Sequence, residues 1–258
     1  GDHNCLTCAQ NGQCELQDLV YWLQIEKPRF EIEPPAYELD NSNTMILRDL
    51  NKCVLCGRCV RACNEIQVNE VLDFSMRGSK AKVGPAFDED YINSSCVFCG
   101  ECVQACPTGA LTFKQAKYAG RPWELAKVRT TCAYCGVGCQ MDLYVKDNKI
   151  VKVMGASDRV TPNQGSLCVK GRFGMDFVSH PSRLTKPLIR KNGELEEASW
   201  DEAFDFIAKK LSAIKEKSGP DSIAGLSSAR VTNEENYLFQ KFMRAVIGTN
   251  NVDHCARL

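Results

Sequence analysis

The residues that could do chemistry in this chain of 258 residues are its sixteen cysteines. Fifteen of them fall in four motifs, Cys5 to Cys14, Cys53 to Cys63, Cys96 to Cys106, and Cys132 to Cys168. Thiols this close together can form disulfides, bind zinc or hold iron–sulfur clusters, and their spacing distinguishes the three. Disulfide frameworks are typical of small secreted domains without a core, whereas 44% of this chain is hydrophobic. We therefore interpret the thiols as reduced metal ligands in a cytoplasmic protein.

The second and third motifs share the spacing C-x2-C-x2-C-x3-C, as CVLCGRCVRAC and CVFCGECVQACP. This is the signature of bacterial two-cluster ferredoxins, in which the fourth cysteine of each run binds the other cluster. One [4Fe–4S] cluster is expected on Cys53, Cys56, Cys59 and Cys106, and a second on Cys96, Cys99, Cys102 and Cys63. Gly57 and Gly100 would let the backbone turn so that N–H groups approach the sulfurs. Two zinc knuckles are the alternative, but they explain neither the third cysteine of each run nor Cys106-Pro107.

The first motif, HNCLTCAQNGQCELQ, supplies Cys5, Cys8 and Cys14, with His3 as the nearby fourth donor. It resembles the His/Cys3 cluster motif of the large iron–sulfur subunit of NADH:quinone oxidoreductases, [FeFe] hydrogenases and NAD-linked formate dehydrogenases. The histidine of those families usually stands four positions before the first cysteine, and His3 stands two before it. A histidine upstream of Gly1 is therefore an alternative ligand, and an ordinary surface role is another reading of His3.

The fourth motif, CAYCGVGCQ, gives Cys132, Cys135 and Cys139, and Cys168 follows after 28 residues. This three-plus-one pattern differs from the paired knuckles of zinc ribbons. It resembles the N-terminal cluster domain of molybdenum or tungsten bis-pterin oxidoreductases. The resemblance implies that Lys170 relays electrons between cluster and pterin, and a solvated surface lysine is the alternative. Four [4Fe–4S] clusters would use fifteen cysteines and His3, which leaves Cys255 unassigned.

The charge and hydropathy of the chain exclude some partners. Lys plus Arg equals Asp plus Glu, at 32 each, so nothing global attracts the chain to nucleic acid or to an anionic membrane. Its apolar runs are far shorter than the roughly 20 residues that cross a bilayer, so no membrane span is expected. Families with this set of motifs often carry a [2Fe–2S] domain before the position of Gly1, and an upstream cluster of that kind is one expectation.

The sequence between and after these motifs predicts the helices and strands of an α+β multi-domain protein. Four parts are expected, a His/Cys3 cluster segment over 1–45, a two-cluster ferredoxin-like domain over 46–127, a small β-rich [4Fe–4S] domain over 128–198, and a truncated α/β molybdopterin-binding domain over 199–258. The apolar spacing from Glu15 predicts a short helix that covers the first cluster, and residues 64–95 should contain strand-like pieces. Alternation on both sides of Asp147-Asn148 predicts a β-hairpin.

The last sixty residues change character. Ser199 and Glu202 form a capping-box pattern before a predicted helix that ends at Gly219, and DSIAGLSSAR predicts a buried strand. Thr232 begins a second predicted helix, ending at Gly248, so an α/β domain is expected. In the turn between strand and helix, SSARVTN, Ser228 and Arg230 could meet a phosphate-bearing cofactor, and an ordinary loop with a surface arginine is the alternative.

The C-terminal segment GTNNVDHCARL, together with SSARVTNEENYLFQKFMRAVIG, closely resembles the catalytic subunit of molybdopterin-dependent formate dehydrogenases. Related nitrate reductases have an Asn where Cys255 stands. The resemblance implies a Mo or W bis-molybdopterin guanine dinucleotide, with a metal-binding Cys or selenocysteine directly after Leu258 and then a His. A selenocysteine codon taken as a stop would produce this end, and a truncation is the other hypothesis.

These resemblances imply the iron–sulfur portion of a formate dehydrogenase or CO2 reductase. Electrons would pass between the pterin site and the clusters, and from the His3/Cys5 cluster to a flavin- or NAD-binding, ferredoxin or hydrogenase subunit. Without the metal ligand beyond Leu258, the chain alone is not expected to oxidise formate. The alternative is a pure electron conduit, as in an NADH:quinone oxidoreductase or hydrogenase-type complex.

Overall fold

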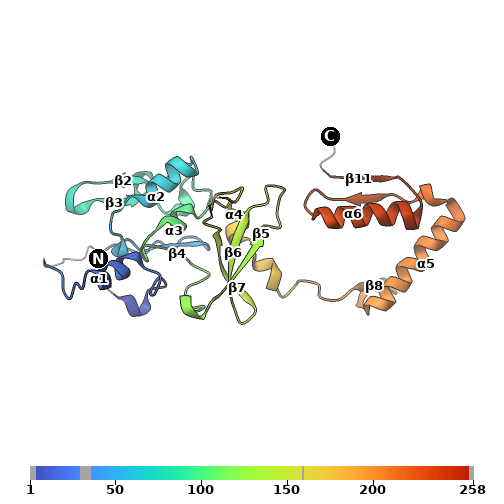
Figure 1. Ribbon diagram of the computed structural model, residues 1–258, viewed down its shortest axis with the longest axis horizontal. Helices are drawn as coiled ribbons and strands as arrows, with labels where there is room; N and C mark the ends of the chain where they lie inside the picture. The colour runs from blue at the N-terminus through green and yellow to red at the C-terminus, as the bar shows by residue number, and fades with distance from the viewer. Residues whose placement is uncertain (1–3, 30–35, 159, 256–258) are drawn as a thin grey trace. The chain divides into compact units, whose positions relative to one another are not determined.

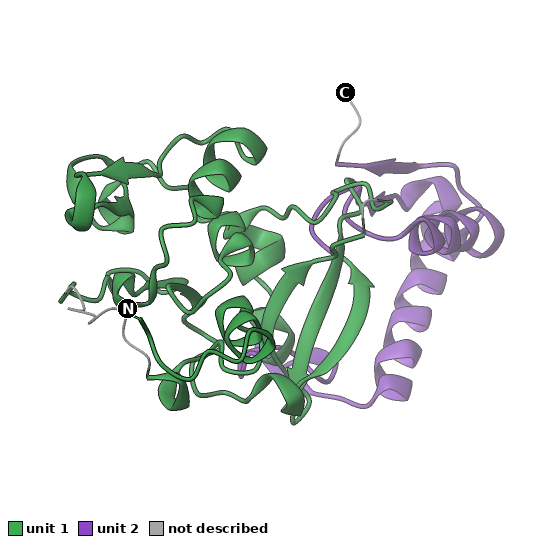
Figure 2. Cartoon of the chain, turned by 60° about the vertical axis from the view of Figure 1, so that its left-hand side comes forward, with its two compact units in different colours: residues 1–132, 137–179 green, residues 133–136, 180–258 purple. Residues whose placement is uncertain are grey.

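The computed structural model describes residues 4–29, 36–158 and 160–255 and divides into two compact units (Figure 1, Figure 2). The first unit comprises residues 1–132 and 137–179, and the second comprises residues 133–136 and 180–258. Both units mix helices with strands, as the α+β prediction requires.

The first unit is built from short elements joined by loops that carry the cysteines. Its helices are α1 (Glu15–Trp22), α2 (Arg58–Arg61), α3 (Glu101–Ala105) and α4 (Val169–Phe173). Its strands are β1 (Ile46–Arg48), β2 (Asp73–Ser75), β3 (Lys82–Gly84), β4 (Leu111–Phe113), β5 (Ala126–Thr131), β6 (Gln140–Lys146) and β7 (Lys149–Gly155). The predicted helix at Glu15 and the predicted strands between residues 64 and 95 are thus confirmed.

The ferredoxin-like part is a pair of antiparallel strands with two short helices. Strand β1 pairs with β4, with Ile46 opposite Phe113 and Arg48 opposite Leu111. All three residues of each strand are buried, because the strands run through the main hydrophobic core. This core also contains Phe173, whose ring centroid lies 5.7 Å from that of Phe113. Helix α4, which follows the last cysteine of the fourth motif, therefore shares the core of the ferredoxin-like part.

A three-stranded antiparallel sheet in the order β5-β6-β7 holds the fourth motif. Strands β6 and β7 form a hairpin, and its two turn residues, Asp147 and Asn148, have φ angles of 50° and 59°. Two consecutive left-handed residues are typical of the tight turn whose twist matches that of a hairpin. The hairpin predicted from the alternating sequence is confirmed, and β5 extends it to a sheet.

The second unit contains helices and short strands, namely β8 (Leu188–Lys191), β9 (Glu194–Glu197), α5 (Trp200–Ser218), β10 (Gly225–Ser227), α6 (Asn233–Lys241) and β11 (Val252–His254). Strand β10 is parallel to β11, and α6 lies between them in the chain. Both predicted helices are confirmed, and Thr232 and Glu235 form the complete capping box of α6. None of the described helices combines the length and the apolar character that a membrane span needs.

Two local predictions in the second unit are wrong. Ser199 accepts a hydrogen bond from the Glu202 amide, but the Glu202 carboxylate binds Lys191 Nζ at 2.7 Å instead of completing a capping box. Within the described residues, β10 pairs only with β11, and Leu226 is 80% exposed. Gly225 faces α6, because a Cβ there would meet Phe239. Successive residues of a strand point to opposite faces, so the exposed Leu226 lies on the other face, which is left uncovered. The strand is therefore not buried.

Candidate iron–sulfur sites

The structure brings the fourth cysteine of the third motif to the first three cysteines of the second motif. We call this set the Cys53 group; its members are Cys53, Cys56, Cys59 and Cys106. Burial raises the pKa of Cys59 to about 12, and the neighbouring charges of Cys106, Cys53 and Cys56 add to the rise. All four side chains line one hollow. Three cysteines from one motif and the fourth from the other form the set that a two-cluster ferredoxin pattern requires.

The complementary set, the Cys96 group, consists of Cys63, Cys96, Cys99 and Cys102. Cys102 is buried, and burial raises the pKa of its thiol well above the usual range. The charges of Cys99, Cys96, Cys59 and Cys63 raise that pKa further, in that order. Because Cys59 belongs to the Cys53 group, the two groups are near neighbours.

The two motifs share a backbone conformation that the sequence did not reveal. Leu55 and Phe98 have φ angles of 54° and 51°, in the left-handed region that bulky residues rarely occupy. The Leu55 amide donates to Cys53 Sγ, and the Phe98 amide donates to Cys96 Sγ, both at 3.4 Å. Such N–H donors stabilise a thiolate and tune the potential of a cluster bound to it.

The Cys5 group, Cys5, Cys8 and Cys14, lines a pocket of about 320 Å³. Leu16, Val20 and Tyr21 of α1 also line it, as the predicted covering helix requires, and so does Cys53. Gly109 lies directly beneath the group, because a Cβ there would stand 2.4 Å from Cys8 Sγ. His3 lies outside the described residues, so its role as the fourth ligand remains a prediction.

The four cysteines of the fourth motif, which the sequence predicts as ligands of one cluster, are called the Cys132 group: Cys132, Cys135, Cys139 and Cys168. The amide of Cys132 donates to the Cys139 carbonyl at 2.8 Å where β5 and β6 meet. Cys168 caps the N-terminus of α4, and a Cβ on Gly171 of that helix would lie 3.5 Å from Cys132 Sγ. Cys135 falls within residues 133–136, which belong to the second unit. Lys170 is exposed on α4, and its role between cluster and pterin stays a prediction.

The donor set suits iron–sulfur clusters. All sixteen cysteines are thiols and none forms a disulfide. Among the described residues, no three His, Cys, Asp or Glu side chains converge closely enough to bind one metal ion. A cluster of four irons and four sulfides is wider than an ion, so its thiolates stand farther apart than zinc ligands do. Soft thiolates in sets of four are the ligands that such clusters take.

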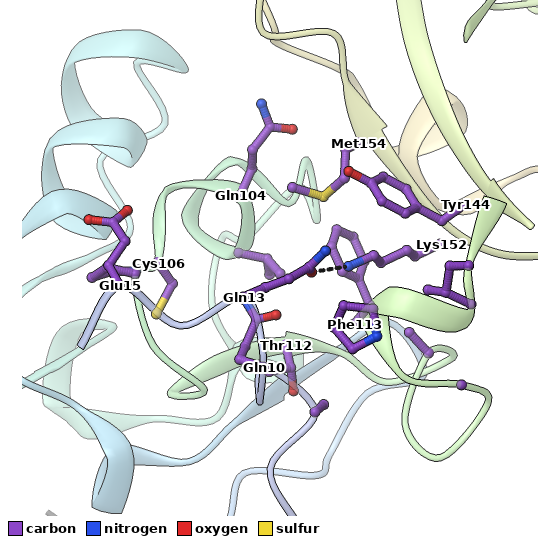
Figure 3. A pocket seen from close by; sticks show the side chains of 17 residues that line it. Gln10, Gln13, Glu15, Gln104, Cys106, Thr112, Phe113, Tyr144, Lys152 and Met154 are labelled. Carbon is purple, nitrogen blue, oxygen red and sulfur yellow. Dashed lines mark hydrogen bonds between the residues drawn. The ribbon is translucent and has the colours of Figure 1, made fainter. Parts of the chain in front are cut away.

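A polar pocket of about 210 Å³ lies where three parts of the first unit meet (Figure 3). Gln13 comes from the N-terminal segment, Gln104 from α3, and Lys152 from β7. Lys152 Nζ donates to Gln13 Oε1 at 3.0 Å and lies 4.6 Å from the ring centroid of Tyr144. Burial lowers the pKa of Lys152. The pocket therefore joins the N-terminal segment, the ferredoxin-like part and the β5-β6-β7 sheet.

The second unit has a pocket of about 450 Å³ beside the carboxyl ends of β10 and β11. In parallel sheets this edge is the usual place for ligands. Ser228 lines the pocket, whereas Arg230 is exposed on the same loop and is not among the lining residues; contact of either residue with a cofactor stays a prediction. Arg244 and His254 do line it, and sequence reasoning missed both; the edge rule for parallel strands would have pointed to His254.

Cys255, which the sequence left without a role, lies against this loop. Its Sγ is 3.8 Å from Ser228 Oγ. Hydrogen bonds from the Ala229 backbone and the Ser228 hydroxyl lower the pKa of Cys255.

Family models match four successive parts of the chain. The NADH-ubiquinone oxidoreductase-G iron-sulfur binding region matches residues 1–29, and the 4Fe-4S dicluster domain matches residues 52–110. The Molybdopterin oxidoreductase Fe4S4 domain matches residues 125–180, and Molybdopterin oxidoreductase matches residues 183–258.

Curated relatives match almost the whole chain. "Probable oxidoreductase YjgC" of Bacillus subtilis (strain 168) is 38% identical over 292 residues, 98% of this chain and 30% of the relative. "Putative formate dehydrogenase YrhE" of the same organism is 39% identical over 297 residues, with the same shares. A solved NAD+-reducing [NiFe]-hydrogenase in the H2-reduced state is similar at 30% identity and a TM-score of 0.43, over 46% of this chain and 51% of that one.

The chain thus spans about 30% of the length of the curated relatives it matches. The grouped thiols agree with the successive iron–sulfur matches, and the βαβ arrangement of the second unit falls within the last match. The chain therefore contains a Molybdopterin oxidoreductase Fe4S4 domain and part of a Molybdopterin oxidoreductase domain, and it is similar to relatives that carry the name "Putative formate dehydrogenase".

Proposed function

We propose that this chain is the electron-transferring iron–sulfur portion of a formate dehydrogenase or CO2 reductase catalytic subunit. The observation that carries the proposal is the order of the four cysteine groups. Cys53 lines the pocket of the Cys5 group, and Cys59 interacts with Cys102 of the Cys96 group. The Cys99 carbonyl in turn accepts a hydrogen bond from Arg172 of α4, whose N-cap residue is Cys168. Neighbouring groups therefore follow one another in a row.

In this proposal each group of thiolates holds one [4Fe–4S] cluster, and His3 or an upstream histidine completes the Cys5 group. When bound, such clusters accept and release single electrons, while a Mo or W bis-pterin centre exchanges two electrons with formate or CO2. The protein contributes the ligand geometry, the N–H donors of Leu55 and Phe98, and the burial that keeps water from Cys102. Lys170 would then lie between the Cys132 group and the pterin.

The pterin side and the partner are part of the same proposal. Ser228, with Arg230 on the same loop, would contact the pterin phosphates, and the metal ligand would be a Cys or selenocysteine beyond Leu258. A flavin- or NAD-binding subunit, a ferredoxin or a hydrogenase would exchange electrons at the Cys5 group. The match of residues 1–29 to the iron-sulfur binding region of an NADH-ubiquinone oxidoreductase subunit favours the first of these.

The test is metal analysis and formate assay of the full-length protein, purified without oxygen. We expect about sixteen irons and a matching amount of sulfide from this portion, with Mo or W bound and formate-dependent reduction of the clusters. Iron without Mo or W, and no response to formate, would instead favour a pure electron conduit. About four zinc ions in place of iron would refute both. The reading frame after Leu258 should encode Cys or selenocysteine followed by His.

A further inference from the structure

The boundary between the Cys96 group and the Cys132 group contains a buried polar junction. Cys168 is the N-cap residue of helix α4, and one turn later the helix carries Arg172, whose side chain has no solvent exposure. Arg172 reaches away from its own part of the chain into the loop that holds Cys99 and into α3. One side chain therefore connects the loops of two predicted ligand groups.

The guanidinium of Arg172 makes three contacts across this boundary. Its Nε donates to the Cys99 carbonyl oxygen at 2.6 Å. One terminal nitrogen donates to Gln104 Oε1 at 2.7 Å, and the other forms an ion pair with Glu101. Glu101 also accepts the Leu167 amide at 3.1 Å, next to Cys168. The planar fork of arginine can hold acceptors in several directions at once, which a lysine cannot do.

The backbone at Gly100 allows Arg172 to approach the Cys99 loop closely. Gly100 has a φ of 75°, and a Cβ there would lie 2.1 Å from Arg172 Cδ. Only glycine permits both the turn after Cys99 and the passage of the arginine side chain. Phe173, the next residue of α4, enters the ferredoxin-like core beside Phe113. The helix is therefore held by an apolar anchor as well as by the arginine.

Stability alone does not explain the junction. A buried ion pair gains little over a well-packed apolar pair, because desolvation offsets the attraction. Phe173 already anchors α4 through apolar burial. What the hydrogen bonds add is direction, since they fix the Cys99 carbonyl relative to the helix that follows Cys168.

We infer that Arg172 is a positioning residue that sets the separation and the coupling of the Cys96 and Cys132 groups. The inference rests on the proposed electron-relay function. The event it serves is the passage of one electron, in which one group's cluster is oxidised, the other's is reduced, and no bond or proton moves. The contact from Arg172 Nε to the Cys99 carbonyl gives a continuous path of bonds and one hydrogen bond between the two ligand loops.

The ion pair has a second consequence. Glu101 neutralises a cation that lies against the backbone of Cys99. Removing the carboxylate would leave a buried positive charge beside the Cys96 group, and such a charge favours the reduced state of a cluster. Glu101 therefore holds the potential of the Cys96 group below the value that Arg172 alone would give it.

The experiment compares Arg172→Lys, Arg172→Gln and Glu101→Gln in the full-length protein. Arg48→Gln is the matched control, because Arg48 is also buried and paired with an acidic residue, Asp40, but lies inside the ferredoxin-like part. Three quantities are measured: iron per chain, the potential of each cluster by EPR-monitored titration, and the spin–spin interaction between reduced clusters. Freeze-quench EPR after mixing with reductant gives the rate of electron passage.

With iron retained, both Arg172 variants should weaken the spin–spin interaction and slow electron passage severalfold, because the contact that fixes the Cys99 loop relative to α4 is lost. Glu101→Gln should raise the potential of the Cys96 group. Arg48→Gln should lower stability but leave the spin–spin interaction and the rate of electron passage between the Cys96 and Cys132 groups unchanged, because Arg48 lies at the Cys53 group. The inference fails if the Arg172 variants keep the wild-type spin–spin interaction and rate of electron passage. It also fails if their only change is an equal loss of iron from all clusters, as a general structural defect would cause. Failure of the proposed function would appear separately, as a wild-type protein without four clusters.

Discussion

Gly109 offers a test of the Cys5 group that does not touch a ligand. The substitution Gly109→Ala adds one methyl group, and its backbone conformation accepts alanine, because its φ lies outside the left-handed region. The new Cβ would stand 2.4 Å from Cys8 Sγ and 3.2 Å from Lys52 Cδ, whereas ordinary contact begins at 3.4 Å. The Lys52 chain can bend away, so the conflict falls on the Cys8 sulfur.

The sulfur must move by about 1 Å, the difference between 3.4 and 2.4 Å. A metal–thiolate bond is about 2.3 Å long, so this displacement is incompatible with an unchanged Cys8 ligand. If the backbone yields instead, overpacking costs about 1–3 kcal/mol. We expect Gly109→Ala to lose the cluster of the Cys5 group and to keep the other three.

The assay is iron and sulfide per chain, together with the EPR signals of the reduced protein. Iron should fall from about sixteen to about twelve per chain, with one signal lost. Gly120→Ala is the control, because its methyl would meet only the side-chain ends of Lys146 and Leu125 and the Glu124 carboxylate. Full iron content with all signals intact in Gly109→Ala would show that Cys8 is not a ligand in this geometry.

Three further predictions concern stability. Burial alone would raise the pKa of Asp40, but hydrogen bonds from Ser42 and the charge of Arg48 help to lower it. A lowered pKa in the folded state stabilises the protein at pH values above the unfolded-state pKa near 3.9. Asp40→Asn should therefore lower the free energy of unfolding by about 3 kcal/mol at pH 7. In denaturant titrations, the difference in stability between variant and wild type should shrink as the pH falls below about 4. Phe173→Ala should lower the free energy of unfolding of the first unit by about 3–5 kcal/mol, and an effect below 1 kcal/mol would contradict its place in the core. Thr232→Ala removes a capping contact worth about 1 kcal/mol, so the amides of α6 should exchange with solvent about fivefold faster, while those of α5 stay unchanged.

The cysteine groups could be anticipated from the sequence because spacing within each motif is a local property. Two glycines, Gly57 and Gly100, marked the turns, and both adopt left-handed angles. The partner left-handed positions at Leu55 and Phe98 were not predicted, since bulky side chains give no sign of that conformation. The ligand loops impose it, and its benefit, an N–H donor to a sulfur, is visible only in three dimensions.

Features that depend on contacts between distant parts of the chain were harder to predict from the sequence. The strand at Gly225 was expected to be buried, but burial depends on which elements cover each face, and Leu226 has no cover among the described residues. The docking of Phe173 into the ferredoxin-like core was not predicted either. An arginine next to an aromatic residue in a short helix has no pattern that identifies its partner sixty or seventy residues away.

The two kinds of boundary between cysteine groups explain where two arginine contacts lie. The Cys53 and Cys96 groups exchange Cys106 and Cys63, so the covalent chain itself fixes their separation. The outer two groups share no cysteine with a neighbour, and non-covalent contacts must fix them. At each of these boundaries an arginine from the next part of the chain donates to a predicted ligand's carbonyl, Arg172 to Cys99 at 2.6 Å and Arg121 to Cys8 at 3.2 Å.

This recurrence has a physical reason. A backbone carbonyl beside a ligand moves with the ligand, and an arginine fork fixes it in direction as well as in distance. Apolar packing such as that of Phe173 limits separation but leaves rotation and sliding less restricted. Electron passage between sites depends on a separation that must not fluctuate, so directional contacts belong where the chain provides no shared ligand. Arg121 should therefore act at the Cys5 group as Arg172 does at the Cys132 group.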